Sequence, residues 1–349
     1  MLNDLAQKMR TERFKAGAID FDRVEVKFNL DEQGKPTGVY FKRSKEANKL
    51  IEEFMLLANR KVAERIGNPK DGKKARTFVY RIHERPLPEK LEEFNRFVAK
   101  FGYGVKTGSR KALTASMNSL MAEVKDKPEQ NMIETLAVRT MAKAVYSTDN
   151  IGHYGLAFDF YTHFASPIRR YPDVMVHRLL QRYLEGGRSV NRDKYEEYCK
   201  HSSDMEQVAA NAERSSVKYK QVEFMADKIG QDFEGTISGV TQWGFYVELE
   251  ENKCEGLVSM TELDDDFYEF DEKNYCIAGR HHHKVYQLGD RVTVRVAKAN
   301  LVARQLDYEL VRDSGNTRIT VAAAAKKSKK EDRRNQKERK GKNKKHSRK

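Results

Sequence analysis

The sequence predicts an α+β domain, a small closed all-β barrel and a disordered basic tail, in that order. Helix-like and strand-like hydrophobic patterns mix first, short strands broken by glycines follow, and a segment rich in lysine and arginine comes last. Hydrophobic periodicity distinguishes helices from strands, and a segment without hydrophobic residues has no core to bury. We therefore place the domains at residues 1–228, 229–313 and 314–349.

The first domain is expected to combine a hairpin with amphipathic helices. Residues 20–43 alternate between apolar and polar side chains on both sides of the turn-like DEQGKP, which predicts a β-hairpin. Apolar residues recur at helical spacing in residues 45–67 and 88–102, and residues 193–229 predict a long charged helix.

Strand patterns dominate between residues 229 and 313. Residues 233–260 contain short alternating runs broken by glycines. Residues 289–311 alternate again, with three valines on one face. Several short strands within about 80 residues predict a small closed barrel.

The net charge of +14 is concentrated in the tail. Residues 326–349 hold 14 Lys and Arg against three acidic residues, so the remaining 325 residues carry only +3. A tail of this composition is expected to be disordered. It serves either as a solubilising terminus or as an electrostatic tether to RNA phosphates, and we favour the tether.

The composition also bears on location and redox state. No apolar stretch approaches the roughly 20 residues of a membrane helix, and the charged amino terminus lacks the apolar core of a signal peptide. We therefore expect a cytoplasmic protein with no membrane partner. The three cysteines form no CxxC pair, so reduced structural thiols are expected.

Residues 154–184, YGLAFDFYTHFASPIRRYPDVMVHRLLQRYL, form the most informative stretch. Pro167 limits helix formation before it, so Arg169 and Arg170 are expected near the start of the following helix. Arginines at that place can bind a phosphate together with the free backbone amides. The alternative is an ion pair with Asp173 that only pins the helix, and the residues leave both interpretations open.

This stretch resembles the signature of the ribonuclease II/RNB exoribonuclease family, in which a tyrosine and THF precede SPIRRYPD and a histidine–arginine pair. Three further segments match that family in the same order: GAIDFD at 17–22, KLIEEFMLLAN at 49–59 and RIHERP at 81–86. A barrel and a basic tail follow, as in the ribonuclease R branch. The resemblance implies the carboxyl-terminal part of an RNB catalytic domain, followed by an S1-type RNA-binding domain with an OB-fold.

The resemblance also implies an activity, the processive 3′-to-5′ hydrolysis of single-stranded and structured RNA to nucleoside 5′-monophosphates at Mg²⁺ ions held by aspartates. By motif, Arg169 is the candidate that offsets charge on the attacked phosphate. Glu213, in NAERSS, matches a glutamate near the active centre, and Glu52, in IEEF, matches one that helps recognise the ribose. Both glutamates could instead be solvated or form structural salt bridges.

The same signature supplies further RNA-binding candidates. They are His163, Ser166, Arg170 and Tyr171. His163 and His177 have a second interpretation as packed, hydrogen-bonded histidines.

In the barrel, TQWGFYVEL places Trp243, Phe245 and Tyr246 around a glycine, where an S1-type fold stacks RNA bases on a strand face. Such stacking contributes roughly 1–3 kcal/mol per base. Side chains alternate along a strand, so Phe245 and Tyr246 must point in opposite directions. Guided by the family, we place Phe245 on the RNA face.

The chain departs from the family in its metal ligands. The family's four aspartates, spaced D-x5-D-x-D-D, have no counterpart, and AIDFDR supplies only Asp20 and Asp22. The acidic residues 263–272 are expected to form a solvated loop. The His281–His283 run is expected to form a flexible loop, because consecutive residues rarely converge on one ion. We assign no metal ligand within this chain.

This departure predicts a fragment of a longer exoribonuclease that is inactive, or nearly so, on its own. Mg²⁺ would then bind to carboxylates outside this chain, and a missing amino-terminal half would be a partner if the gene is split. The alternative function is a non-catalytic module that grips RNA through the barrel and the tail.

Overall fold

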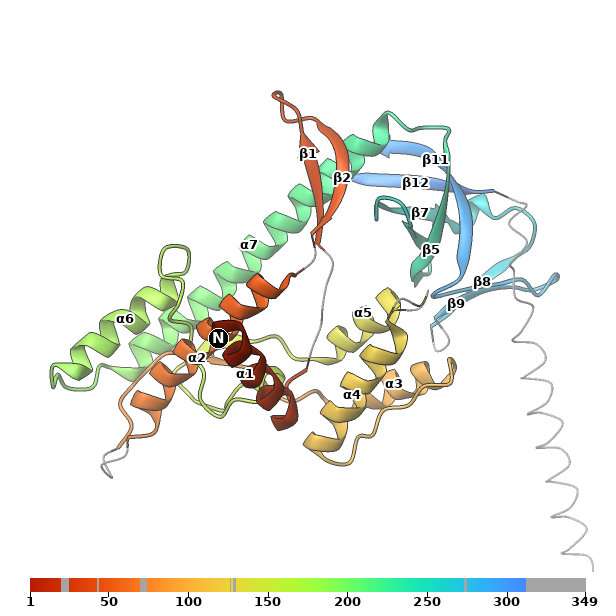
Figure 1. The fold of residues 1–349 in the computed structure, drawn as a ribbon. Coiled ribbons are helices and arrows are strands. Elements are labelled where there is room, and N and C mark those ends of the chain that lie inside the picture. Colours follow the sequence, from red (N-terminus) through yellow and green to blue (C-terminus); the bar gives the residue numbers. More distant parts are fainter. Residues whose placement is uncertain are drawn as a thin grey trace, which may run out of the picture. The chain divides into compact units, whose positions relative to one another are not determined.

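The computed structural model describes residues 1–19, 25–42, 44–69, 74–125, 127, 130–272 and 275–311. The chain forms two compact units (Figure 1). Unit 1 comprises Met1–Lys27 and Val39–Val217, and unit 2 comprises Phe28–Gly38 and the chain from Lys218 onward. The domain boundaries expected from the sequence stay a prediction, and the basic tail at 314–349 lies outside the described residues.

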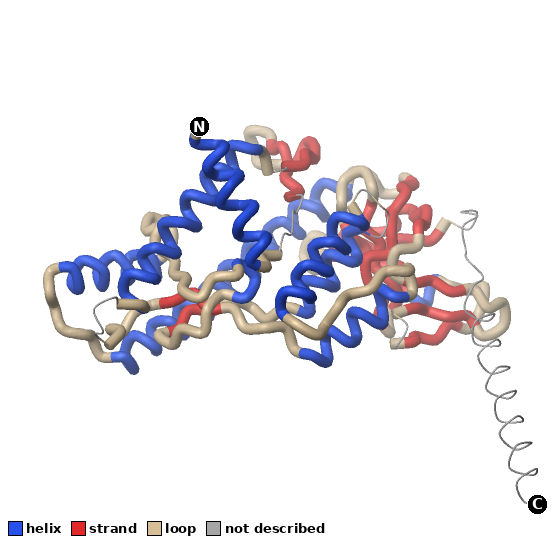
Figure 2. Tube along the Cα trace, turned by 60° about the horizontal axis from the view of Figure 1, so that its bottom comes forward, coloured by secondary structure: helices blue, strands red, loops and turns tan. Residues whose placement is uncertain are grey.

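Unit 1 is mainly helical, as the blue tubes in Figure 2 show. Its helices are α1 (Leu2–Ala16), α2 (Glu46–Gly67), α3 (Pro88–Ala99), α4 (Arg110–Val124), α5 (Gln130–Thr140), α6 (Tyr171–Leu184) and most of α7 (Arg192–Ala226). The helices predicted from hydrophobic spacing are thus confirmed as α2, α3 and α7. Two short strands, β3 (Tyr80–Ile82) and β4 (Val145–Ser147), pair antiparallel. None of the described helices is both long and apolar enough to cross a membrane.

A hydrophobic core surrounds β3 and α6 in unit 1. Phe78 and Val79 are fully buried and belong to the same cluster as Val176 and Leu179 of α6. The α6 residues point to one side because apolar positions three apart share a helix face. The Thr162 hydroxyl donates a hydrogen bond to the Val79 carbonyl at 2.6 Å, which ties the segment before α6 to this core.

A buried ion pair joins α1 to α2. Arg13 is 7% exposed and Glu53 is 3% exposed. The Arg13 guanidinium contacts the Glu53 carboxylate through both Nη2 and Nε, and Arg10 lies 3.8 Å from the same carboxylate. A buried charge without its partner is strongly destabilising. The pair therefore fixes how α1 lies on α2.

The predicted hairpin is confirmed over residues 25–42, as β1 (Glu25–Leu30) and β2 (Pro36–Lys42). Its tip belongs to unit 2. Lys35 forms an ion pair with Asp227 at 2.7 Å, and Lys220 donates to the Gly34 carbonyl at 2.6 Å. These bonds anchor the tip to the chain around the end of α7.

Unit 2 contains the predicted barrel. Its strands are β5 (Asp232–Thr241), β6 (Gly244–Leu249), β7 (Glu255–Ser259), β11 (Arg291–Asn300) and β12 (Gln305–Leu310), closed in the order β11-β12-β7-β6-β5. Val292, Val294 and Val296 all point into the core, as their alternation predicts. Gly256 lets the Tyr308 ring approach, because an added Cβ would lie 2.6 Å from it.

A three-stranded sheet accompanies the barrel in unit 2. It consists of β8 (Tyr268–Asp271), β9 (Cys276–Gly279) and β10 (Val285–Gln287). The acidic residues 263–272 therefore do not form a solvated loop, because part of that stretch is strand β8. The expectation was wrong because acidic composition alone does not reveal carboxylates that are held by backbone amides.

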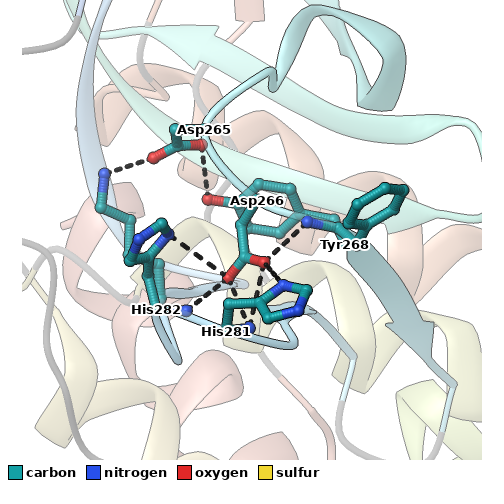
Figure 3. Close-up of polar contacts among 7 residues, drawn as sticks. Asp265, Asp266, Tyr268, His281 and His282 are labelled. Carbon is teal, nitrogen blue, oxygen red and sulfur yellow. Dashed lines mark hydrogen bonds and ion pairs between the residues drawn. The ribbon is translucent and has the colours of Figure 1, made fainter.

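Asp266 holds the turn between β9 and β10, as Figure 3 shows. Its side chain is fully covered, and its carboxylate accepts the backbone N–H groups of His281 at 2.9 Å, His282 at 2.6 Å and Phe267 at 2.7 Å. It also bonds His281 Nδ1 at 2.9 Å. The His281–His283 run is thus an exposed turn on a buried carboxylate.

The pKa of the Asp266 carboxyl lies well below its usual range. Burial alone would raise this pKa, but the N–H groups of His282, His281 and Phe267 stabilise the ionised form and outweigh it. The pKa of Asp265 is lowered in the same way: burial opposes the shift, and Lys284 and Tyr268 outweigh burial. Asp265 and Asp266 are therefore ionised in the folded state, where their bonds hold the chain around this sheet.

We expect Glu53→Gln to destabilise unit 1 by about 3 kcal/mol or more, because it leaves Arg13 buried without its charged partner. Glu52→Gln is the matched control. Glu52 is 50% exposed and 3.7 Å from Arg13, so its loss should cost less than about 1 kcal/mol. Urea unfolding followed by circular dichroism measures both, and equal losses would contradict a structural role for the buried pair.

Acid should weaken unit 2 through Asp266. Because its folded-state pKa is depressed, its contribution to stability is complete above the unfolded pKa of about 4 and is lost as the pH falls below it. Asp266→Asn should therefore melt at a lower temperature near neutral pH, and its melting temperature should fall less than the wild type's between about pH 5 and pH 2.5.

The fluorescence of Trp243, the chain's one tryptophan, reports melting of unit 2. Glu251→Gln, at an exposed turn, removes one carboxylate without disturbing this sheet and is the control. Parallel acid profiles for Asp266→Asn and the wild type would show that Asp266 has no such role.

Candidate nucleic-acid interface

Asn59 of α2 positions the segment that precedes α6. Its side chain is buried, and its Oδ1 accepts the backbone N–H groups of Phe164 at 2.9 Å and Ala165 at 3.0 Å. Its Nδ2 donates to the Tyr161 hydroxyl at 3.1 Å. One side chain thus satisfies two backbone amides that have no partner in a helix or strand.

Asp173, in the first turn of α6, holds the other end of the segment. It is fully buried, and its Oδ1 accepts the Ser166 N–H at 2.8 Å and Arg170 Nη2 at 2.9 Å. The Ser166 carbonyl in turn accepts the N–H groups of Arg169 and Arg170. The Arg–Asp pair left open by the sequence therefore exists, and it involves Arg170.

The pair is not fully satisfied. Arg170 Nε and Asp173 Oδ2 are buried and have no hydrogen-bond partner among the described residues. Buried polar atoms without partners are costly, so they are rare in folded proteins and concentrate at functional sites.

Arg169 takes no part in this pair. Its side chain is exposed and forms no hydrogen bond or ion pair with any residue that the structure describes. Tyr171, at the start of α6, is 57% exposed, and Ile168 is fully exposed. The amino terminus of α6 therefore presents a free guanidinium beside the unpaired amides of a helix start.

A pocket of about 370 Å³ brings Glu52 and Arg170 together. Asn59 and Tyr161 also line it, and Ile51 and Met55 of α2 supply apolar walls. Glu52 faces this pocket, whereas its neighbour Glu53 is buried against Arg13. Of the two glutamates in IEEF, the one selected from the sequence is therefore the accessible one.

His163 is a packed, hydrogen-bonded histidine. Its Nδ1 bonds the Tyr146 hydroxyl at 2.8 Å, and its ring meets the Tyr161 ring edge-on at 5.7 Å. Burial, followed by the charges of Arg170 and Arg81, lowers the pKa of His163 to about 2. The imidazole is therefore neutral near pH 7 and can offer a hydrogen bond but no charge.

Sequence reasoning missed the residues that support this histidine. Arg81 forms two hydrogen bonds to Glu206, at 2.6 and 2.8 Å, and its guanidinium lies 4.5 Å from the Tyr146 ring centre. Arg81 lies in RIHERP and Asn59 ends KLIEEFMLLAN, two segments that match the family. Membership in these segments was the only signal in the sequence that pointed to either residue.

The remaining candidates in unit 1 lie apart from the pocket lining. His177 stacks on Phe164 with ring centres 4.1 Å apart and bonds the Phe164 carbonyl at 2.9 Å, so it is a packed histidine. Glu213 is exposed on α7 and forms no ion pair with a described residue. Its assignment to the active centre stays a prediction.

The barrel corrects one assignment among its aromatic residues. Phe245 is fully buried and stacks on Tyr286 with ring centres 5.1 Å apart, so its placement on an RNA face was wrong. It points inward with Val247 and Leu249 on alternate positions of β6. Tyr246 is half-buried on the other face, and Trp243, at the turn before β6, is 69% exposed.

The described residues do not hold a group of three or more His, Cys, Asp or Glu side chains placed to bind a metal ion. Asp20 and Asp22 lie outside the described residues. The expectation that the Mg²⁺ ligands lie outside this chain stays a prediction.

Family models match both parts of the chain. The model described as RNB domain matches residues 1–186, and the model described as S1 RNA binding domain matches residues 226–309. Ribonuclease R of Aquifex aeolicus is 38% identical over 318 residues, which cover 89% of this chain and 44% of that protein. Ribonuclease R of Thermotoga maritima is 39% identical over 321 residues, with the same two coverages.

Solved structures of RNase R are similar to this chain as well. The apo form of Mycoplasma genitalium RNase R has a TM-score of 0.82 and 29% identity, over 89% of this chain and 49% of that one. The same enzyme in complex with ribose methylated single-stranded RNA gives the same values. The chain spans less than half the length of these curated relatives. With its RNB model covering residues 1–186 and an S1 domain after it, the chain belongs to the RNB family.

Proposed function

We propose that this chain is the carboxyl-terminal part of a 3′-to-5′ exoribonuclease of the ribonuclease R type. It would take single-stranded and structured RNA, hydrolyse it processively and release nucleoside 5′-monophosphates. The observation that carries the proposal is that the two arginines of SPIRR differ. Arg170 is paired with Asp173, whereas the exposed Arg169 at the start of α6 has no side-chain partner among the described residues.

In this function, Arg169 offsets the charge that builds on the attacked phosphate. Glu52, at the edge of the pocket that Arg170 also lines, accepts hydrogen bonds from a ribose hydroxyl. Neutral His163 and Tyr171 contact the same strand without adding charge. The Mg²⁺ ions expected for this reaction would bind to carboxylates outside this chain.

The barrel would hold the strand as it is shortened. Exposed Trp243 and half-buried Tyr246 offer ring faces to successive bases, and such stacking does not depend on sequence. The two RNA complexes solved for Mycoplasma genitalium RNase R, with single-stranded and double-stranded RNA, support RNA as the ligand. We further propose that the protein acts in the cytoplasm.

The second candidate function is RNA binding without hydrolysis. The observation that favours it is the lack, among the described residues, of a group of three or more His, Cys, Asp or Glu side chains placed to bind a metal ion. In that case the barrel and the basic tail would grip RNA, and Arg169 would contribute only to binding.

The nuclease test incubates 5′-labelled single-stranded RNA with Mg²⁺ and this chain, alone or joined to the segment of a ribonuclease R relative that carries the aspartates. We expect no shortening by the chain alone and stepwise shortening by the joined protein. Arg169→Ala should slow the joined protein by about 100-fold or more with little loss of RNA binding. Arg188→Ala, at an exposed arginine outside the signature stretch, is the matched control.

Shortening by the chain alone would refute its inactivity. Unchanged rates in the Arg169→Ala variant would refute the role given to that arginine.

Trp243→Ala should weaken binding of a labelled single-stranded RNA by about 5- to 100-fold, the equivalent of one lost base stack. Trp243→Phe should recover most of the affinity because it restores a ring. Phe245→Ala should instead lower the melting temperature of unit 2, because Phe245 fills its core. Fluorescence anisotropy and thermal melting separate the two effects, and RNA affinity insensitive to Trp243→Ala would count against the stacking role.

A further inference from the structure

A second, strongly basic pocket of about 630 Å³ lies in unit 1, on the carboxyl-terminal half of α2. Its walls come from α2, from the chain before β3, from the loop before Tyr161 and from the end of α6. Its charged residues are the cations Arg60, Lys61, Arg65, Lys74 and Arg76 and the carboxylates Glu64 and Asp159. None of them lines the pocket that contains Glu52 and Arg170.

Glu64 offsets only one positive charge of the pocket, although two of the cations bind it. Arg60 Nε lies 2.6 Å from one carboxylate oxygen and Lys61 Nζ lies 2.8 Å from the other. Burial opposes ionisation of Glu64, but the bonds from Lys61 and Arg60 outweigh it and lower its pKa. The three form a closed group with a single surplus positive charge.

Arg60 and Arg76 are held in place before any ligand arrives. The Arg60 guanidinium lies 5.2 Å from the centre of the Phe158 ring, in addition to its bond with Glu64. Arg76 Nη1 donates to the Tyr183 carbonyl at 3.0 Å, and its guanidinium lies 5.1 Å from the Tyr183 ring centre. Neither contact neutralises Arg76, so it keeps its charge in a fixed position.

Arg65 and Lys74 are exposed, and neither forms an ion pair with a residue that the structure describes. Arg65 stands in the last turn of α2, where a cation also interacts favourably with the helix dipole. That explanation does not extend to Lys74, which lies outside any helix. The helix dipole therefore does not account for all the cations that line this pocket.

We propose that this pocket binds a phosphate monoester, namely the 5′-phosphate of a ribonucleotide. A phosphate carries close to two negative charges near pH 7, and its oxygens match the donors of arginine. The pocket volume falls within the range of small-ligand sites. The choice of a ribonucleotide rests on the proposed function. The group could come from a free nucleoside 5′-monophosphate or from the 5′ end of an RNA strand.

The test measures binding of adenosine 5′-monophosphate to the whole chain by isothermal titration calorimetry at low salt. We expect saturable binding, weakened about tenfold or more in the double variant Arg65→Glu/Lys74→Glu. The control, Lys90→Glu/Lys200→Glu, reverses two exposed lysines of unit 1 and changes the net charge by the same amount. It should bind like the wild type.

Further probes identify the source of the phosphate. Adenosine, which lacks it, should not bind. A 5′-phosphorylated hexaribonucleotide that binds more tightly than its 5′-hydroxyl counterpart points to an RNA end, whereas preference for the mononucleotide points to the free nucleotide.

No binding by either phosphorylated probe, or equal binding by the Arg65→Glu/Lys74→Glu variant, would overturn the proposal. Failure of the exonuclease function would appear separately, as RNA left unshortened by the joined protein in the nuclease test while nucleotide binding stays intact.

Discussion

Two buried polar side chains, Asn59 and Asp173, determine the geometry on which the rest of the candidate site depends. Together they accept the backbone N–H groups of residues 164, 165 and 166, a segment that has no regular partner. Each of those amides would cost about 1–3 kcal/mol if it were buried and unpaired. Pairing all three amides therefore fixes the path of this segment between α2 and α6. The backbone position of Arg169, which follows the segment, is fixed with it.

The same network explains why two adjacent arginines differ. The Asp173 carboxylate is reached by Arg170 and not by Arg169, so one positive charge is neutralised and the other is left for a ligand. Although it is paired with Asp173, the Arg170 guanidinium still affects His163. Together with burial and Arg81, its charge lowers the pKa of His163 and keeps the imidazole uncharged. In the proposed function, the Arg169 guanidinium would be available to the RNA strand, because no residue that the structure describes pairs with it.

The sequence predicted most elements of the fold and the main motif, but it did not predict side-chain directions. Helical spacing located α2 and α3, and SPIRRYPD located the start of α6. Alternation established that Phe245 and Tyr246 point in opposite directions, yet only barrel closure decides which side is the core, and the wrong one was chosen. Asp266 was misjudged for a related reason: its partners are backbone amides 15 and 16 residues away, which carry no signature in sequence.

The polar side chains of α2 differ between its two parts. The part of the helix up to Asn59 carries Glu52, Glu53 and Asn59, whose partners are arginines and backbone amides. The part after Asn59 carries Arg60, Lys61 and Arg65 with one carboxylate already bound. In the proposed function, the strand has to advance past the start of α6 after each cleavage while it stays bound, and additional fixed cations there would hinder that movement. The surplus positive charge of α2 lies instead in the proposed phosphate pocket, whose lining does not include Glu52 or Arg170.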